Sequence, residues 1–284
     1  MEIQQTPWYS EYLRSLNWHI ERVDGVNLFF KKLPIIGGLA KVQRPDKLPP
    51  AAALVSLLKK YHVRTVAIEP SLEQDEKLLS AWCNQLAQHV RFNKSPFLPT
   101  KTIRINLTPT AETIFRDFTE AKRRAVRRAL KYEVGVGGSD DIETFIKVKN
   151  ASAGFLGFIT TYGLRNLWRI APSQNRAILL ASKKSDRSHF LGGVLLLFWD
   201  SIAYYWIAGA TRRGKKMFAP TLLAWEAIKL SKKKKCRWFD FVGVWDERLP
   251  AENRSWTGFT KFKEGFAGQS LYYPLIEVNK LLSK

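Results

Sequence analysis

The chain has 284 residues, of which 45% are hydrophobic, and it contains 10 Trp, 17 Phe and 9 Tyr. This apolar content excludes a disordered protein, and the length suits about two domains. Basic residues number 46 and acidic residues 25, so the net charge of +21 favours polyanionic partners: nucleic acid, an anionic membrane surface or a phosphorylated substrate. Two cysteines without metal-ligand spacing exclude zinc fingers and disulfide-rich secreted scaffolds.

Segments that would direct the chain to a membrane are not predicted. The first twelve residues lack the charged and apolar runs of a signal peptide. The most apolar run, residues 191–199, is nine residues long, whereas a spanning helix needs about 20. We therefore expect a soluble cytoplasmic protein, whose charge also allows peripheral contact with the inner face of the cell membrane.

Short strand patterns alternate with amphipathic helices along the chain, which predicts an α/β (α+β) fold. Helices are expected at residues 8–16, 51–61, 76–90, 110–131, 142–153 and 220–230. Strands are expected at residues 18–23, 27–32, 65–70, 102–107, 176–183, 190–199, 201–210 and 238–244, with a polar turn at 184–189. The glycines at 135, 137 and 138 are expected to break the chain. We therefore predict a first domain at 1–133 that regains the tail at 270–284, and a second domain at 134–269.

Motifs of several common enzyme classes are absent from the sequence. There is no G-x-x-x-x-G-K-S/T, no H-E-x-x-H and no G-x-S-x-G, and the four histidines are scattered. Residues 176–210, followed by a basic loop at 211–216 and a helix near Pro220, resemble an acyl-CoA N-acyltransferase core. In that fold the junction binds pyrophosphate, because backbone N–H groups at a helix start hold anions. The loop does not fit the usual R/Q-x-x-G-x-G/A pattern, and a merely basic surface loop is an equal alternative.

Six stretches of sequence carry a family resemblance by their order. They are the opening segment from Trp8 to Trp18, TIRINL at 102–107, KRRAVRRALKYEV at 122–134, YYWIAGA at 204–210, FDFVGV at 239–244 and FKEGFAG at 262–268. Together they resemble the Fem family of peptidoglycan-bridge aminoacyltransferases. The resemblance implies two fused acyl-CoA N-acyltransferase-like (GNAT-like) domains, each a mixed central sheet flanked by helices. The chain departs from the family at 150–156, where an expected Arg that helps to hold the precursor is missing and Arg165 or Arg169 would have to substitute.

The chemistry that this resemblance implies is transfer of an amino acid from aminoacyl-tRNA to an amine of a lipid-linked or nucleotide-linked peptidoglycan precursor. No metal or other cofactor is expected, and aminoacyl-tRNA is the co-substrate. Lys263 matches the family Lys of F-K-x-x-F, and its ammonium suits the oxyanion that develops on the ester. Phe262 is expected to orient the site by packing on the terminal adenosine of the tRNA. Asp240 is expected to accept a proton or hold the amine, or else to be a turn aspartate that binds backbone N–H groups.

Basic residues gather in three segments that we predict to contact the polyanionic substrates. The predicted contacts are Arg123, Arg124, Arg127 and Lys131 on the helix at 122–131; Arg212, Arg213 and Lys215 in the loop; and Lys232, Lys233, Lys234, Lys235 and Arg237. A solvated basic face is the alternative for each segment. Two other functions remain open, an acyl-CoA-dependent N-acyltransferase and a non-catalytic relative that binds RNA or membranes. The residues do not decide which amino acid is carried or which stem residue accepts it.

Overall fold

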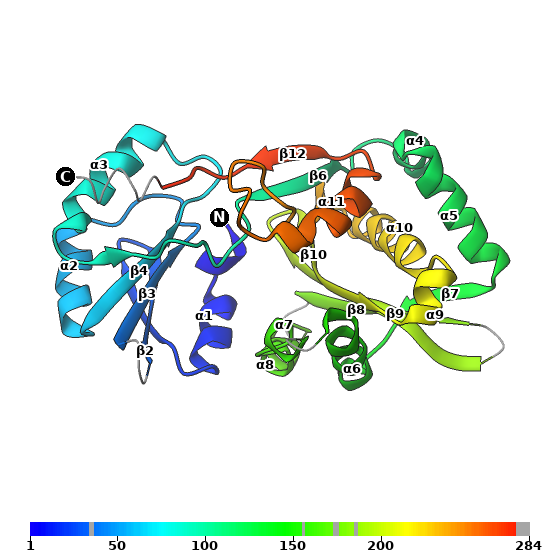
Figure 1. Cartoon of the computed structure of the whole chain (residues 1–284), viewed down its shortest axis with the longest axis horizontal. Coiled ribbons are helices and arrows are strands. Elements are labelled where there is room, and N and C mark those ends of the chain that lie inside the picture. Colours follow the sequence, from blue (N-terminus) through cyan, green and yellow to red (C-terminus); the bar gives the residue numbers. More distant parts are fainter. Residues whose placement is uncertain (34–36, 155–156, 173–175, 185–186, 277–284) are drawn as a thin grey trace. The chain divides into compact units, whose positions relative to one another are not determined.

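The computed structural model describes residues 1–33, 37–154, 157–172, 176–184 and 187–276. It contains two compact units (Figure 1). The first unit comprises residues 1–101, 245–253 and those from 271 onward, and the second comprises residues 102–244 and 254–270. The boundaries of these units differ from those of the domains expected at 1–133 and 134–269. The expected domains stay a prediction.

The first unit is built on a five-stranded sheet of order β1-β2-β3-β4-β5. Its strands are β1 (His19–Val23), β2 (Val26–Leu33), β3 (Gly37–Gln43), β4 (Val63–Glu69) and β5 (Arg91–Phe92). Its helices are the 3-10 helix η1 (Ile3–Gln5), α1 (Pro7–Arg14), α2 (Ala51–Lys60) and α3 (Glu76–Ala87). The sheet is mixed, because β1, β2 and β3 pair in antiparallel fashion whereas β3, β4 and β5 run parallel.

Helices cover both faces of this sheet (Figure 1). Leucines of α2 and α3, such as Leu54 and Leu86, form one core with Phe30 of β2. On the opposite face Tyr9 of α1 meets Phe29, with ring centroids 6.2 Å apart. The parallel strands β4 and β5 pair only at Thr65–Arg91 and Val66–Phe92. Their carboxyl ends therefore separate beyond Val66, which is where open α/β sheets commonly bind ligands.

The second unit is built on a seven-stranded sheet of order β12-β6-β11-β10-β9-β8-β7. Its strands are β6 (Lys101–Asn106), β7 (Val134–Gly138), β8 (Ala177–Lys184), β9 (Arg187–Trp199), β10 (Ile202–Ala210), β11 (Trp238–Asp240) and β12 (Gln269–Tyr272). Its helices are α4 (Ala111–Asp117), α5 (Glu120–Lys131), α6 (Ile142–Ala153), α7 (Gly157–Thr160), α8 (Leu164–Ile170), α9 (Arg212–Lys216), α10 (Ala219–Lys233), the 3-10 helix η3 (Arg254–Trp256) and α11 (Thr257–Glu264).

Packing explains why residues 102–131 belong with the second unit. β6 pairs in antiparallel fashion with β11, and α5 packs against α10. α10 buries Leu223 and Ala227 in a core that also contains Phe118, Phe239 and Phe266. On the other face, α6 packs against β9 and β10 (Figure 1). The second unit is thus again a mixed sheet between helices, which confirms the predicted fold class.

Several predicted elements need correction. The helix expected at 110–131 is interrupted after Asp117, because Phe118 takes an extended conformation and buries its ring. The basic loop expected at 211–216 contains the short helix α9, and the glycines at 135, 137 and 138 lie in strand β7 rather than in a break. The strand expected at 238–244 ends at Asp240, since Val242 has a φ of +69° and its N–H bonds back to the Asp240 carboxylate.

Parts of three predictions lie outside the described residues. They are the middle of the turn at 184–189, the end of the stretch 150–156 and the tail beyond 276. The described start of that tail, β12, joins the seven-stranded sheet beside β6. Within the described part of the chain, no helix is both long and apolar enough to cross a membrane.

Candidate active site

The candidate active site lies where α11 meets the end of β11 in the second unit. Lys263 is on the last turn of α11, and its Nζ donates to the carbonyl oxygens of Phe241, at 2.8 Å, and Gly243. Both carbonyls belong to the turn that follows β11, in which Val242 has a φ of +69°. An ammonium has three donors, and the described residues accept from two of them. The third can serve a substrate oxygen.

Burial sets the ionisation of Lys263. It lowers the pKa of the ammonium to about 7, and although Asp240 opposes this shift, Lys149 adds to it. The Nζ atom also lies 4.9 Å from the centre of the Phe259 ring. Few carboxylates offset the charge of this ammonium. It is therefore suited to stabilise a negative charge that develops on a substrate, because electrostatic interactions are stronger in a poorly solvated site.

Asp240, the last residue of β11, is engaged by its neighbours. Its carboxylate accepts from Arg104 Nε at 2.6 Å, from the Thr102 hydroxyl and from the Val242 N–H at 2.6 Å. The β6–β11 register places Arg104 directly opposite Asp240. Only 1% of the Asp240 surface is exposed. These contacts agree with the alternative interpretation, in which Asp240 is a structural aspartate that holds the turn with the Phe241 and Gly243 carbonyls.

Phe262 lies next to Lys263 on α11 and packs inward. Its ring centre is 5.3 Å from that of Phe266, and Lys122 Nζ of α5 sits 3.8 Å from the Phe262 ring centre. Gly265 allows this approach, since a Cβ there would come within 2.6 Å of the Lys122 side chain. Burial lowers the pKa of Lys122 to about 8. The ring of Phe262 therefore packs against a second partly buried lysine whose pKa is lowered. The expected stacking of Phe262 on adenosine stays a prediction.

Lys149 on α6 connects this site to the basic helix α9. Gly209 of β10 lets α6 come close, because a Cβ there would lie 2.9 Å from the Lys149 Cα. Burial lowers the pKa of Lys149, and the charge of Lys215 lowers it further. The structure thus brings Lys215, predicted as a polyanion contact, into electrostatic range of Lys149, which in turn acts on Lys263.

Neither Lys122 nor Lys149 was predicted as a site residue. Lys122 opens the basic helix motif at 122–134, which could have signalled it, whereas no local pattern singles out Lys149.

The remaining predicted polyanion contacts differ in their availability. Arg127 and Lys131 of α5 are exposed, as are Arg212 and Arg213 of α9. Arg124 makes an exposed ion pair with Glu120 at 3.4 Å. Arg123, by contrast, donates Nη1 to the carbonyl oxygens of Arg116, at 2.5 Å, and Phe118, so it closes the end of α4. That these residues contact a polyanion stays a prediction. Arg123 also has a structural role, because it binds backbone carbonyls.

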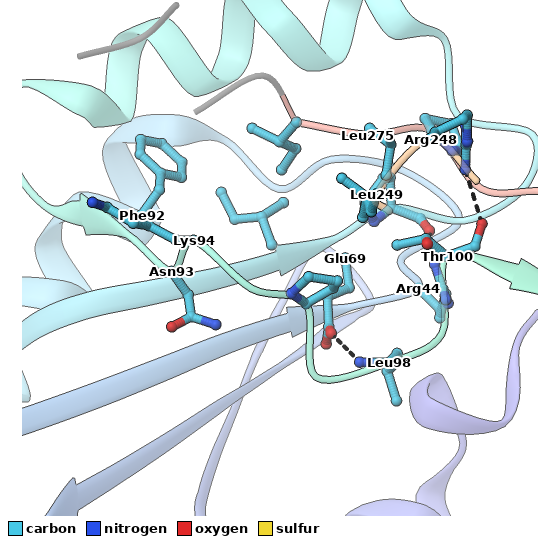
Figure 2. Close-up of a pocket in the computed structure, with 15 residues that line it drawn as sticks. Arg44, Glu69, Phe92, Asn93, Lys94, Leu98, Thr100, Arg248, Leu249 and Leu275 are labelled. Carbon is cyan, nitrogen blue, oxygen red and sulfur yellow. Dashed lines mark hydrogen bonds between the residues drawn. The ribbon is translucent and has the colours of Figure 1, made fainter. Parts of the chain in front are cut away.

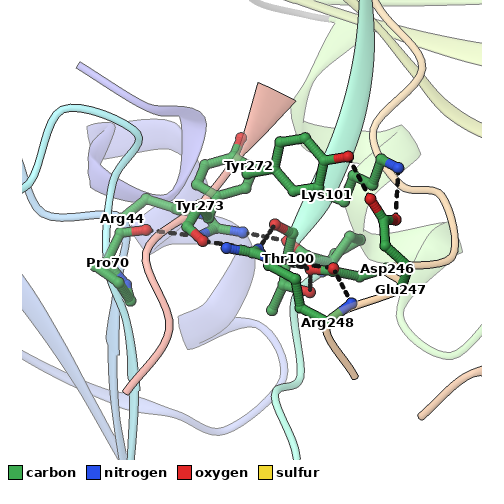
Figure 3. A network of polar contacts seen from close by, with 10 residues as sticks. Arg44, Pro70, Thr100, Lys101, Asp246, Glu247, Arg248, Tyr272 and Tyr273 are labelled. Atoms are coloured by element: carbon green, nitrogen blue, oxygen red, sulfur yellow. Dashed lines mark hydrogen bonds and ion pairs between the residues drawn. The ribbon is translucent and has the colours of Figure 1, made fainter. Parts of the chain in front are cut away.

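The first unit contains a pocket of about 570 Å³ at the separated ends of β4 and β5 (Figure 2). Its walls are largely apolar, and Glu69, at the end of β4, reaches it with a carboxylate that is 3% exposed and accepts from the Leu98 N–H. Arg44 donates to the Pro70 carbonyl at 2.6 Å and lies 3.3 Å from the Tyr273 ring centre (Figure 3). Sequence analysis missed this pocket, because residues 274–276 return to line it from the far end of the chain.

These features define a tandem acyltransferase-like protein with a lysine-centred site in its second unit. Residues 172–273, which include β11 and α11, match the model of the FemAB family. This match confirms the resemblance to the Fem family drawn from the sequence. No curated protein matches the chain at a significant level.

Several solved structures share the fold of this chain. A crystal structure of FemX is 15% identical with a TM-score of 0.71, over 96% of this chain and 90% of that one. The C-terminal domain of a putative lysylphosphatidylglycerol synthetase from Agrobacterium fabrum is 10% identical with a TM-score of 0.58, over 99% and 92%. A tandem GNAT protein from the clavulanic acid biosynthesis pathway is 14% identical with a TM-score of 0.53, over 89% and 79%. At these identities the similarities establish the fold.

Proposed function

We propose that this protein transfers an amino acid from aminoacyl-tRNA to an amine of a peptidoglycan precursor stem peptide. The observation that carries the proposal is the Lys263 ammonium, held by two backbone carbonyls with one donor left over and set within the FemAB-matching segment. The family to which that segment is similar makes the bridges between cell-wall peptides.

The reaction needs positioning and charge stabilisation. The acceptor amine attacks the ester carbonyl, a C–N bond forms, and the carbonyl oxygen becomes an oxyanion. Collapse of this intermediate breaks the C–O bond to the tRNA ribose, and the proton lost by the amine ends on the ribose oxygen. Lys263 would donate its third N–H to the oxyanion, which is worth about 3–4 kcal/mol for one well-placed donor. Asp240 would act through the turn it holds and takes no proton in this scheme.

The pocket of the first unit has the properties of a ligand site. Its volume of about 570 Å³ lies within the range of small-molecule sites, roughly 300–1,000 Å³. The apolar walls suit aliphatic parts of a peptide, and the buried Glu69 carboxylate, which accepts from Gln43 Nε2 and the Leu98 N–H, adds a negative charge. These properties favour an acceptor that carries an amine on an aliphatic chain.

The acyl-CoA alternative is less well supported by the α9 region. The N–H of Gly214 donates to Thr211 Oγ1 at 2.9 Å, and the N–H of Lys215 donates to the Thr211 carbonyl at 3.0 Å. The N–H groups of Met217 and Phe218 are also bonded within the chain. These four N–H groups are already used and do not offer free donors to a pyrophosphate.

Reconstitution tests the proposal directly. The protein is incubated with charged tRNA and with nucleotide-linked and lipid-linked precursors, in parallel with acetyl-CoA, and products are identified by mass spectrometry. We expect one precursor to gain an aminoacyl residue while the tRNA is deacylated, and Lys263→Met to suppress that product. An unchanged precursor together with acetyl-CoA consumption would replace the proposal by the acyl-CoA alternative.

A further inference from the structure

We propose that a basic pocket at the turn between β9 and β10 binds backbone phosphates of the tRNA acceptor stem. The inference rests on the proposed function, because it assigns a second contact for the same RNA. The pocket has a volume of about 460 Å³ and lies within the second unit. Its charged lining is formed by Arg176, Asp200, Lys233, Lys234 and Lys235, and Phe198 and Trp199 supply its aromatic rings.

The backbone around this pocket is fixed by hydrogen bonds. The turn residues Asp200 and Ser201 both have positive φ, of 49° and 60°, as a tight hairpin requires. The Ser201 carbonyl accepts from the N–H of Arg237 at 2.7 Å and of Trp238 at 3.2 Å. The hairpin turn is thereby tied to the segment that follows α10, and the three lysines at the end of that helix are presented on ordered backbone.

The cations that line the pocket outnumber its carboxylates. Arg176, Lys233, Lys234 and Lys235 make no ion pair with any residue that the structure describes. Aromatic rings accompany two of them, since Arg176 lies 4.7 Å from the Trp199 ring centre and Lys234 lies 5.2 Å from that of Phe198. Four cations therefore surround one carboxylate, that of Asp200.

Lys232, the first residue of the same run, differs from the three lysines that follow it. Its Nζ donates to the Leu107 carbonyl at 2.8 Å, so it secures α10 to the end of β6. The three following lysines are left for a ligand. A run of four lysines that looks uniform in the sequence thus divides into one structural residue and three that line the pocket.

The chemistry of the pocket favours RNA phosphates over a membrane surface. The cations line a hollow with a Trp in its wall, and a hollow suits a chain of phosphates. A flat membrane surface would instead be bound by residues that protrude from the protein. Cys236 of the pocket precedes β11 and the carbonyls that bind Lys263 follow it, so the two sites lie at opposite ends of this strand. Four residues separate Cys236 from Phe241, and this segment spans about 17 Å when extended, or about five base-pair steps of a duplex. An RNA whose 3′ end reached Lys263 would present stem phosphates at that range.

The test compares two variants that lose the same charge. One variant is K233Q/K234Q/K235Q, and the control is K47Q/K59Q/K77Q, whose exposed lysines lie in the first unit. Both reduce the net charge from +21 by three. Binding of an acceptor-stem minihelix RNA is measured by fluorescence anisotropy as a function of salt, with a melting curve for each protein. The arginine variant K233R/K234R/K235R serves as the rescue.

We expect the pocket variant to bind at least about tenfold more weakly than the control and to have a salt slope smaller by about 2–3. The arginine variant should restore both values, which separates loss of charge from loss of folding. Equal binding by the pocket variant and the control would overturn the pocket assignment, and transfer that still depended on Lys263 would leave the proposed function intact. If instead the pocket variant loses binding only to vesicles of equal phosphatidylglycerol and phosphatidylcholine, the ligand is a membrane. A wild-type protein that neither binds the minihelix nor transfers from tRNA would refute both.

Discussion

The network around Asp246 in the first unit and the lysines around Lys263 in the second unit handle charge in opposite ways. In the first unit, Lys101 donates to Glu247 at 2.7 Å, and Arg248 donates to Asp246 at 2.7 Å and to the Tyr273 carbonyl (Figure 3). Burial alone would lower the pKa of Lys101, but its hydrogen bonds to Glu247 and Tyr272 raise it. In the second unit, burial lowers the pKa of Lys122, Lys149 and Lys263.

This difference separates charges that hold the fold from charges that await a ligand. A paired and hydrogen-bonded ion stabilises the folded chain, and removing one partner leaves the other uncompensated. A lysine whose pKa is lowered by burial weakens the fold in its charged form, and an anionic substrate can supply the missing partner. We therefore expect the lysines around Lys263 to form part of a binding and catalytic site, and the Asp246–Arg248 network to stabilise the scaffold.

Replacing Lys263 tests the catalytic side of this contrast with the largest expected effect. Lys263→Met keeps much of the length and packing but removes the donor to the oxyanion, so we expect single-turnover transfer to slow by about 10²–10³-fold. Substrate affinity should change little, because the lost interaction forms mainly in the transition state. A variant that transfers at the wild-type rate with an unchanged melting temperature would show that Lys263 is an ordinary lysine.

The pH profile sharpens the same assignment. Because the pKa of Lys263 is about 7, its ammonium is lost as the pH rises through this value. If the ammonium is the active form, the transfer rate should fall by about tenfold per unit above pH 8. Lys263→Arg keeps its charge throughout, so any activity it retains should lack this falling limb. A wild-type rate that instead rises steadily through pH 7 would assign Lys263 as a base.

Local sequence patterns predicted part of this site, and long-range packing determined the rest. Lys263 was predicted because F-K-x-x-F is a short local motif that begins on α11, and the mixed sheets followed from alternating strand and helix patterns. Lys149 could not be found, since its position depends on α6 approaching β10 at Gly209. The use of Arg123 was hidden by the break after Asp117, which brings its guanidinium to the carbonyls of α4. Periodicity reports the face of a helix but not what lies beyond its end.

The scaffold side of the contrast predicts a loss of stability at Asp246. Its carboxylate accepts from Arg248 Nη2 at 2.7 Å and from the Thr100 hydroxyl at 2.6 Å, and it is 5% exposed. Asp246→Asn removes the charge from these bonds, so we expect the free energy of unfolding to fall by about 2 kcal/mol in urea titrations. Glu143→Gln, which breaks the exposed pair with Arg165, should cost less than about 1 kcal/mol.

The pH dependence of that loss follows from the direction of the pKa shift. Burial would raise the pKa of Asp246, but the hydrogen bonds from Arg248 and Thr100 lower it below its ordinary value of 3.8. The carboxylate therefore stabilises the folded state above pH 3.8, and this contribution is lost as the pH falls through the lowered pKa. The difference between wild type and Asp246→Asn should shrink under those acidic conditions. A constant difference would mean that the shape of the side chain, and not its charge, matters.

The smallest expected effects separate two arginines of the same helix. Arg123 donates to the carbonyls of Arg116 and Phe118, so Arg123→Ala should lower the free energy of unfolding by about 1 kcal/mol. Arg127 is exposed, and Arg127→Ala should leave stability within about 0.5 kcal/mol of wild type. In tRNA titrations the order should reverse, because Arg127→Ala should reduce the salt slope by about 1 and Arg123→Ala should leave it unchanged. An Arg123 variant with wild-type stability and a reduced slope would move that residue from the scaffold to the RNA-binding surface, and the division between paired and available charges would then not hold along α5.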